Sequence, residues 1–355
     1  ITVSDCTLDP VFNSATTEYS CKVPNSVSSV TVNATATSTK AKVRGLGIKS
    51  LSVEVNTLPI RVIAEDGSKK NYNIKVTRKD ASEKVSIFGK TYQTTGDFPT
   101  LTTSSNNSKD DNGLYKSTDT NSGKPTYYFR GNVENNYVSF AGFTWRIVRI
   151  NEDGTIRVVM QDGINNNATY QFNSKYNNYN YMYYINSEVK KQLDTWYQAN
   201  IGNKETLASK VASGNYYCEE AKVKVNSSWS SGNTTMSLYN KYISNFKCST
   251  DGNNHGLVNE NVGLLTHDEV VYAGGYLGTV NNQYYLYNNF TYWLISPAGY
   301  SGSYASAYIV GSLGYIDFNQ YSATYASCLR PVLNLKPDTQ ISSGDGSKDR
   351  PFIVE

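Results

Sequence analysis

The sequence contains little charge, few histidines and no long apolar run. Only 18% of its 355 residues are charged, and the formal net charge is +3. Lysine and arginine form no stripe, so nucleic acid is not expected as a partner. No apolar run approaches about 18 residues, so no membrane-spanning helix is predicted. No signal peptide is visible, and because the chain begins with Ile1 we expect a piece of a longer protein that has lost a leader or anchor.

Cysteine spacing also lacks the common zinc motifs. None of the five cysteines lies in a CxxC pair, and the sequence has only two histidines. Cys6 and Cys21 flank a predicted turn, and Cys218 and Cys248 flank a loop. We therefore expect two local disulfides and one odd thiol, Cys328, in an oxidising extracellular compartment. The alternative is five reduced cysteines in a cytosolic protein.

Tyrosine, asparagine, serine and threonine take the place of charge. The chain has 30 tyrosines, and hydrophobic residues make up 39% of it. This usage is typical of secreted β-rich proteins and is too aromatic for a disordered chain. A chain of 355 residues exceeds the usual size of one core, so we expect two domains.

Residues 1–80 are predicted to form a small all-β unit. Alternation of β-branched and polar residues occurs over 29–36, 51–55, 60–63 and 72–76. This period of two is typical of strands with one buried face. Asp66-Gly67 indicates a hairpin, because glycine accepts the positive φ of a tight turn. About seven short strands with frequent turns predict a β-sandwich.

Two segments of this unit resemble a known family. The cadherin-like β-sandwich domain repeated in Gram-positive surface proteins is similar to LDPVFNSATTEYSCKVPNSVSSVTVNATAT and VIAEDGSKKNYNIKVTRK. The resemblance covers nearly all of residues 1–79. It implies a spacer module without catalysis and without the calcium sites of true cadherins. Cys6 and Cys21 depart from the family, and we interpret them as an added disulfide worth about 3 kcal/mol.

Residues 81–355 are predicted to form an α+β domain. β-branched and aromatic residues indicate strands over 126–130, 137–140, 143–150 and 155–160. One helix is expected from Ser187 to Ile201, because apolar residues recur along one face. A second follows the capping box of Thr266 and Glu269 and ends at Gly274. The last part of the chain returns to short strands.

The stretch from Tyr292 to Leu335 is predicted to carry a ligand-binding face. Its apolar ends, around Trp293 and Val332, are expected to be core strands. Its middle combines tyrosine with serine, glycine and asparagine, which give rigid aromatic contact and adaptable hydrogen bonds. The alternative is that these tyrosines pad half-buried strand edges. The predicted ligand-binding residues are Tyr300, Tyr304, Tyr308, Tyr315, Asp317, Asn319, Tyr321 and Tyr325.

The second domain carries a resemblance of its own. An uncharacterised domain of surface proteins from Gram-positive bacteria and their wall-less relatives is similar to NVENNYVSFAGFTWRIVRINEDGTIRVV, NVGLLTHDEVVYAGG and YWLISPAGYSG…LRPVLNLKPDTQISSGDGSKDRPFIV. The closing W-x-x-SP and RPVLNL patterns also resemble variable proteins of diversity-generating retroelements. That resemblance implies the C-type-lectin-like fold, which formylglycine-generating enzymes share, with a ligand facing the residues before Leu329. Cys328 departs from the glycine that relatives usually carry.

Catalytic chemistry has little support in the sequence. Nucleophilic catalysis needs a base beside a serine or cysteine, but no motif places His255 or His267, and we expect His267 to face solvent. A copper-thiol site would need two cysteines in the C-terminal core, where only Cys328 lies. Paired acids could hydrolyse glycosides, although acids are mostly exposed. The acids that we expect in solvent include Glu219, Glu220, Asp268, Glu269 and Asp317.

Calcium is the one cofactor left open. The loops Asp110–Gly113 and Asp345–Ser347 offer oxygen ligands, which suit a hard cation. Neither has the spacing of an EF-hand, and turn formation alone explains such clusters. We otherwise expect no cofactor and no metal.

These observations predict the exposed part of a bacterial cell-surface protein. A spacer (1–80) precedes a C-type-lectin-like domain (81–355) that binds a host or bacterial surface protein, or a glycan, without catalysis. One alternative is a structural subunit of a surface layer or fibre, in which tyrosine-rich faces pack against other copies. Another is an enzyme, which would need a cleft with convergent acids or a metal.

Overall fold

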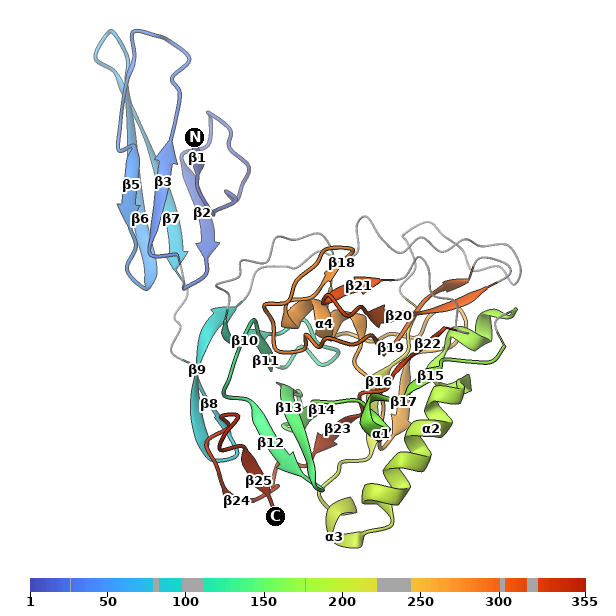
Figure 1. The fold of residues 1–355 in the computed structure, drawn as a ribbon. Helices are drawn as coiled ribbons and strands as arrows, with labels where there is room; N and C mark the ends of the chain where they lie inside the picture. The colour runs from blue at the N-terminus through green and yellow to red at the C-terminus, as the bar shows by residue number, and fades with distance from the viewer. Residues whose placement is uncertain are drawn as a thin grey trace. The chain divides into compact units, whose positions relative to one another are not determined.

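The chain divides into two compact units, one of residues 1–85 and 91–99 and the other of residues 86–90 and 100–355 (Figure 1). The division passes through the hairpin of β8 (Lys84–Ile87) and β9 (Lys90–Asp97). The computed structural model describes residues 1–25, 27–78, 83–97, 112–175, 177–221, 244–300, 304–317 and 325–355.

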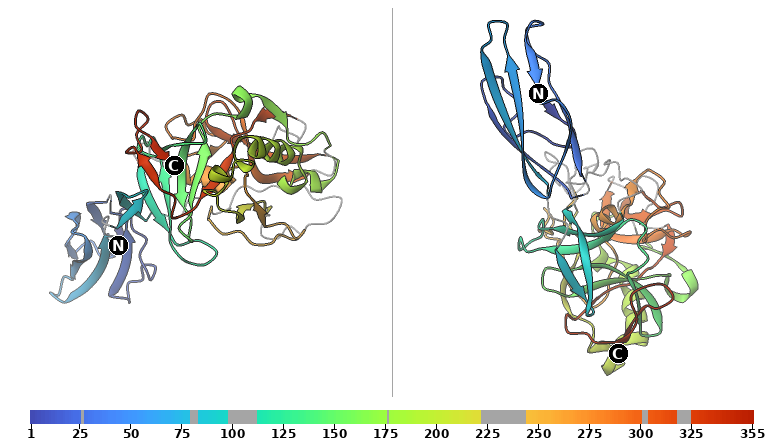
Figure 2. Two further views of the ribbon diagram at one scale, coloured as in Figure 1. Left: turned by 90° about the horizontal axis from the view of Figure 1, so that it is seen from below. Right: turned by 90° about the vertical axis from the view of Figure 1, so that its left-hand side faces the viewer.

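The first unit is a sandwich of two sheets, with strand orders β1-β3-β5 and β2-β7-β6-β4. Alternate side chains, such as Val32, Ile60 and Ile74, point between the sheets and are fully buried. In the right-hand view of Figure 2 these strands, drawn in blue, run side by side. The β-sandwich predicted for this region is confirmed. Its strands are β1 (Thr2–Val3), β2 (Glu18–Val23), β3 (Ser29–Asn33), β4 (Lys42–Arg44), β5 (Gly47–Ser50), β6 (Glu54–Ile63) and β7 (Lys69–Arg78).

A turn, a disulfide and a parallel strand pair fix this sandwich. Gly67, in the turn between β6 and β7, has φ of +83°, as the predicted hairpin requires. Cys6 and Cys21 form the predicted disulfide, with their Cα atoms 5.7 Å apart. β2 runs parallel to β7, and its register extends from Glu18 opposite Asn73 to Val23 opposite Arg78.

The larger sheet of the second unit contains the strand order β24-β25-β12-β13-β11-β10. β14 pairs with β13 and also with β23, so the end of the chain returns to the middle of this domain. Trp145, Ile147 and Val158 are fully buried on these strands. The strands are β10 (Gly113–Ser117), β11 (Thr126–Arg130), β12 (Tyr137–Phe140), β13 (Phe143–Ile150), β14 (Ile156–Met160), β23 (Val332–Leu335), β24 (Ile341–Ser343) and β25 (Phe352–Val354).

A second sheet has the order β15-β22-β19-β20-β21-β18, and β16 pairs with β17 apart from it. Trp293, Leu294 and Ile295 on β19 are fully buried, which confirms the predicted core strand. The stretch from Tyr292 to Leu335, predicted to carry the ligand-binding face, also contains β20 and β21, which pair with each other. The strands are β15 (Thr169–Gln171), β16 (Gly214–Cys218), β17 (Leu257–Glu260), β18 (Tyr276–Leu277), β19 (Tyr292–Tyr300), β20 (Ala305–Val310), β21 (Tyr315–Asp317) and β22 (Ala326–Cys328).

Two helices follow the sequence signals closely. α2 (Glu188–Tyr197) begins after its cap Ser187 and buries its apolar stripe, including Val189 and Leu193. α4 (His267–Ala273) begins with the predicted capping box and ends at Gly274, whose φ is +123°. In the part of the chain that the structure describes, no helix has the length and apolar character needed to cross a membrane. The shorter helical segments are α1 (Ile164–Asn167), η1 (Tyr179–Met182), η2 (Tyr184–Asn186), η3 (Gln198–Gly202) and α3 (Glu205–Ala208).

Removing the first disulfide should weaken the first unit alone. In Cys6→Ala/Cys21→Ala the unfolded chain regains conformational freedom, so the free energy of unfolding of this unit should fall by about 3 kcal/mol. Urea unfolding followed by far-ultraviolet circular dichroism measures the loss. All four tryptophans lie beyond residue 79, so tryptophan fluorescence should report an unchanged transition for the second unit. A fluorescence midpoint that moves with the mutation would contradict this expectation.

Candidate ligand-binding cavity

The second unit contains a cavity of about 420 Å³, a volume within the range of small-molecule sites. Its buried floor comes from the first turn of α4, the end of β13 and the β19–β20 hairpin. Its more exposed rim comes from residues 121–124, residues 152–153 and β16. One wall consists of residues 245–248. Segments far apart in the sequence therefore line one cavity.

A buried ion cluster forms part of the floor. The Glu269 carboxylate lies 2.5 Å from Nε of Arg157 and 3.1 Å from Nε of Arg149. Burial alone would raise the pKa of Glu269, but the two arginines and the Thr266 N–H lower it overall. The sequence-based expectation that Glu269 is in solvent is wrong, because the two arginines of β13 and β14 compensate its charge in the interior.

The Arg149 guanidinium links this cluster to the cavity wall. It lies over the ring of Phe246, 4.8 Å from the ring centroid. Burial lowers the pKa of Arg149, while Glu269 acts in the opposite direction. Phe246 in turn stacks on Tyr272 of α4, with 4.3 Å between ring centroids. The residues of the wall therefore pack directly against those of the floor.

His267 and Asp268 complete the floor. The prediction that His267 faces solvent is wrong, since its side chain is 6% exposed. Ser296 Oγ accepts a hydrogen bond from the His267 backbone N–H at 2.9 Å, and the Tyr308 ring packs against the imidazole with 4.8 Å between centroids. His267 Nδ1 lies 3.2 Å from Oδ1 of Asp268, which is also buried rather than in solvent as expected. The cause is the packing of α4 against β19 and β20.

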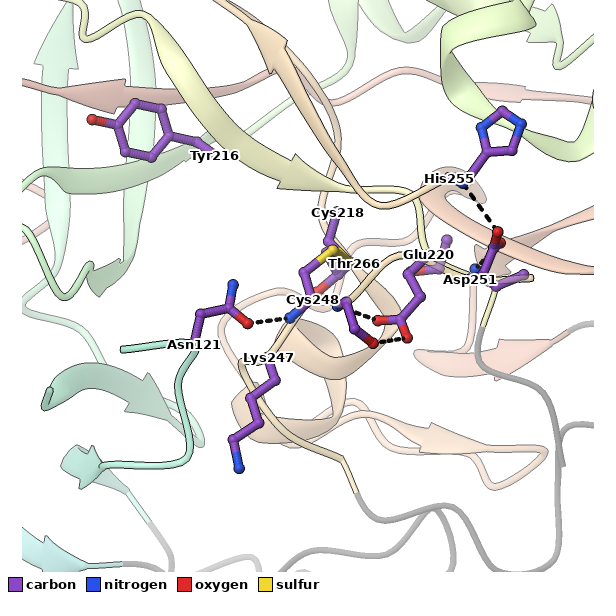
Figure 3. The surroundings of a disulfide bond; sticks show 12 residues. Asn121, Tyr216, Cys218, Glu220, Lys247, Cys248, Asp251, His255 and Thr266 are labelled. Carbon is purple, nitrogen blue, oxygen red and sulfur yellow. Dashed lines mark hydrogen bonds between the residues drawn. A yellow bond between two sulfur atoms is a disulfide. The ribbon is translucent and has the colours of Figure 1, made fainter. Parts of the chain in front are cut away.

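The predicted Cys218–Cys248 disulfide forms one wall of the cavity (Figure 3). Glu220 lies beside the sulfur atoms and accepts hydrogen bonds from the backbone N–H and Oγ of Ser249, at 3.0 Å and 2.6 Å. Asn121 Oδ1 accepts a hydrogen bond from the Cys248 N–H at 2.9 Å. Covalent and hydrogen bonds thus hold this wall to β16 and to the rim.

Acidic residues on the rim are held by hydrogen bonds. Asp153 accepts one from the Tyr216 hydroxyl at 2.8 Å. Burial raises the pKa of Tyr216 to about 12, and Asp153 adds to the increase. Glu152 accepts a hydrogen bond from the Ser122 N–H at 2.9 Å. These side chains are oriented before any ligand arrives.

His255 belongs to a separate cluster outside the cavity lining. Its Nδ1 lies 2.7 Å from Oε1 of Glu219, and its ring stacks on Tyr183 with 3.5 Å between centroids. Glu219 is 1% exposed, so its predicted place in solvent is wrong. Burial raises the pKa of Glu219, although the hydrogen bonds from His255 and from the Ile185 N–H oppose the increase. This pair joins the end of β16 to the 251–255 loop.

The structure separates the predicted ligand-binding tyrosines. Tyr308 lines the cavity from β20 and is 4% exposed. Tyr304 and Tyr325 are 50% and 51% exposed, and neither belongs to the described lining of the cavity. Tyr300 is half-buried, and its hydroxyl donates to the carbonyl of Asn177 at 3.1 Å.

The remaining predicted ligand residues lie around β21. Tyr315 and Asp317 are half-buried there. Tyr315 packs close to Gly311, which leaves no room for a side chain at that glycine. Asn319 and Tyr321 lie outside the described residues.

The two loops considered for calcium differ in what the structure describes. Asp110 and Asp111 lie outside the described residues. Asp345 accepts a hydrogen bond from the Ser347 N–H at 3.0 Å and pairs with Arg350 at 3.3 Å. Hydrogen bonds from Ser347 lower the pKa of Asp345. These contacts are those of a turn, and Lys90 also donates a hydrogen bond to the carbonyl of Asp345.

Several lining residues have no prediction in the sequence analysis, among them Arg149, Asn151, Tyr216 and Ser296. One signal was available for Arg149: a charged residue inside an otherwise apolar strand requires a compensating partner. The sequence gives no indication of which partner that is.

Comparison with known families gives a match to the first part of the chain. The model of the family described as "Cadherin-like beta sandwich domain" matches residues 1–79. The first unit is therefore a cadherin-like β-sandwich, as the resemblance of its sequence implies. Searches of curated proteins and of solved structures found no match.

The ion cluster under the cavity yields a stability prediction. Glu269→Gln leaves two arginines buried without their counter-charge, so the free energy of unfolding of the second unit should fall by about 3–5 kcal/mol. Tryptophan fluorescence during urea unfolding measures it. The matched control is Asp194→Asn, which breaks the partly exposed Lys190–Asp194 pair on α2 and should cost under about 1 kcal/mol.

The same substitution should change the pH dependence. Because the folded pKa of Glu269 lies below its unfolded value, its contribution is present above the unfolded pKa and is lost as the pH falls through the folded pKa. Stability of the wild-type second unit should therefore fall more steeply in acid than that of Glu269→Gln. If the stability of the two proteins falls equally as the pH is lowered, the result would contradict the role assigned to this carboxylate.

Proposed function

We propose that this chain is part of an extracellular, non-enzymatic binding protein whose second unit holds its ligand in the cavity above α4. The observation that carries the proposal is the cavity itself, which has about 420 Å³ of space, a buried floor and an open polar rim. Pockets of this size, with apolar walls and a few fixed polar groups, are the usual form of small-ligand sites.

The lining suits a neutral, polar ligand such as the terminal sugar of a glycan or a short peptide segment. Tyr216 and Tyr308 supply aromatic surface, and Leu257 adds an apolar edge. Amide groups at the rim, from Asn215 and Asn245, can both donate and accept hydrogen bonds. Rigid aromatics beside adaptable amides are the combination that binding surfaces favour.

The state of the acidic residues supports binding rather than catalysis. Each of the five carboxylates in the described lining has a hydrogen bond or ion pair within the protein, as set out above. Glu269 in particular is held charged between two arginines. A general acid or base needs a proton to exchange with substrate, whereas groups engaged in this way act as fixed acceptors.

The proposal extends to the family and location of the second unit. The W-x-x-SP segment on β19 and the RPVLNL segment at β23 are what support a C-type-lectin-like relationship. A cadherin-like spacer and two disulfides are consistent with an extracellular protein. The partner would be a protein or glycan on a host or bacterial surface.

Blocking the cavity tests the proposal without knowledge of the ligand. Asn215→Trp and Leu257→Trp place an indole into the cavity from neighbouring strands and should each reduce capture on a glycan and surface-protein array at least tenfold. The matched control, Tyr304→Ala/Tyr325→Ala, removes two exposed tyrosines of the sequence-predicted face. Far-ultraviolet circular dichroism checks that every variant is folded.

The two sets of variants separate two positions for the ligand. Loss of capture in both tryptophan variants, with full capture by the double alanine variant, supports the cavity. The reverse pattern would assign binding to the tyrosine face of residues 300–325 instead. Self-association of the wild type in light scattering, without any capture, would favour the structural subunit of a surface layer or fibre.

A further inference from the structure

The cavity wall brings Cys248 beside Cys218 and Glu220, which belong to a separate segment of the chain. Sγ of Cys218, Sγ of Cys248 and a carboxylate oxygen of Glu220 lie within 4.8 Å of one another. The two sulfur atoms are joined as a disulfide. The absence of a CxxC pair disfavours a zinc site when the sequence alone is considered. The fold nevertheless brings together two cysteines from separate segments, as a CxxC motif does within one segment.

We propose that this cluster is a redox-gated metal site. In its oxidised state it is a disulfide of the cavity wall, and in its reduced state it binds a thiophilic divalent cation of the zinc class. Cys218 and Cys248 would supply two thiolates, and Glu220 would supply one carboxylate oxygen. This inference is independent of the ligand proposed for the cavity.

The reaction balances with a dithiol as the reductant. The disulfide takes two electrons and two protons from the dithiol, which is itself oxidised to a disulfide. The two thiols formed on Cys218 and Cys248 then release two protons as the cation binds, because the thiolate is the metal ligand.

The donor set and its spacing fit a small four-coordinate cation. Zinc bonds of about 2.3 Å to sulfur and about 2.0–2.2 Å to oxygen place neighbouring ligand atoms roughly 3.5–4 Å apart. The two sulfur atoms are bonded to each other in the disulfide, so reduction must let them move apart to this spacing, and the Glu220 carboxylate lies within 4.8 Å of both. Two soft thiolates favour zinc over calcium or magnesium, and three protein ligands leave one position open.

The ligands keep their places without the sulfur–sulfur bond. Cys218 lies opposite Leu257 in the β16–β17 ladder. The Cys248 N–H is bonded to Asn121, and the Glu220 carboxylate is held by two hydrogen bonds from Ser249. Such outer contacts orient metal ligands. Reduction therefore frees the two sulfur atoms on a backbone that remains anchored.

The sulfur atoms of this site are more accessible than the thiol of Cys328. Cys218, Glu220 and Cys248 are half-buried and line the cavity, so a small dithiol can reach them. Cys328 is 2% exposed, and its thiol donates to the carbonyl of Asn167 at 3.0 Å. Burial raises the pKa of Cys328, which keeps it a thiol.

Cobalt binding to the full chain tests the site. After reduction with a phosphine and anaerobic desalting, the wild type should bind one equivalent of Co²⁺ with a thiolate-to-cobalt charge-transfer band. The oxidised protein should show no such band. Cys218→Ser/Cys248→Ser should lose the band, and Glu220→Gln should raise the dissociation constant about tenfold or more. The matched control is Glu152→Gln, an acid of the same cavity away from the sulfur atoms, which should bind as the wild type does.

Alkylation mapping decides the result even if reduction loosens the fold. Zn²⁺ added to the reduced chain should slow iodoacetamide modification of Cys218 and Cys248, read by peptide mass spectrometry, while Cys6 and Cys21 react as before. Equal modification of Cys218 and Cys248 with and without Zn²⁺ would overturn the proposal. So would an undiminished cobalt–thiolate band in Cys218→Ser/Cys248→Ser, because the ion would then bind at other cysteines.

Discussion

The charge balance around Glu269 is the constraint on which the second unit depends. Glu269 closes the capping box of α4 and is buried there, and a buried carboxylate persists only beside opposite charge. Arg149 and Arg157 supply that charge from two adjacent strands. At the other end of α4, Arg130 donates to the carbonyls of Val271 and Tyr272 at 3.0 Å and 2.7 Å. The helix that floors the cavity is thus fixed to the larger sheet at both ends.

Much of the fold could be predicted because its signals are local. The cap at Ser187, the capping box at Thr266 and the hairpin turn at Gly67 each depend on residues a few positions apart. The buried segment 293–295 follows from its apolar composition. The cadherin-like sandwich also follows, since strand alternation reports one buried face.

The cavity could not be predicted, because its parts meet only after long-range packing. Position 267 sits at a helix N-terminus, where exposure is the reasonable expectation, yet β19 and β20 cover it from residues 296 and 308. Tyrosine composition alone also could not separate Tyr308, which lines the cavity, from Tyr304, which is exposed. The burial of Glu269 depends on arginines more than a hundred residues away.

The parallel pairing of β2 and β7 has a mechanical consequence. Tension on the N-terminal side reaches β2 through the Cys6–Cys21 bond, which bypasses the loop between them, and tension on the C-terminal side leaves β7 after Arg78. The two parallel strands are then pulled in opposite directions along their length. Their hydrogen bonds carry load in shear and must yield together rather than one after another. The first unit is therefore expected to resist stretching along the direction of these strands.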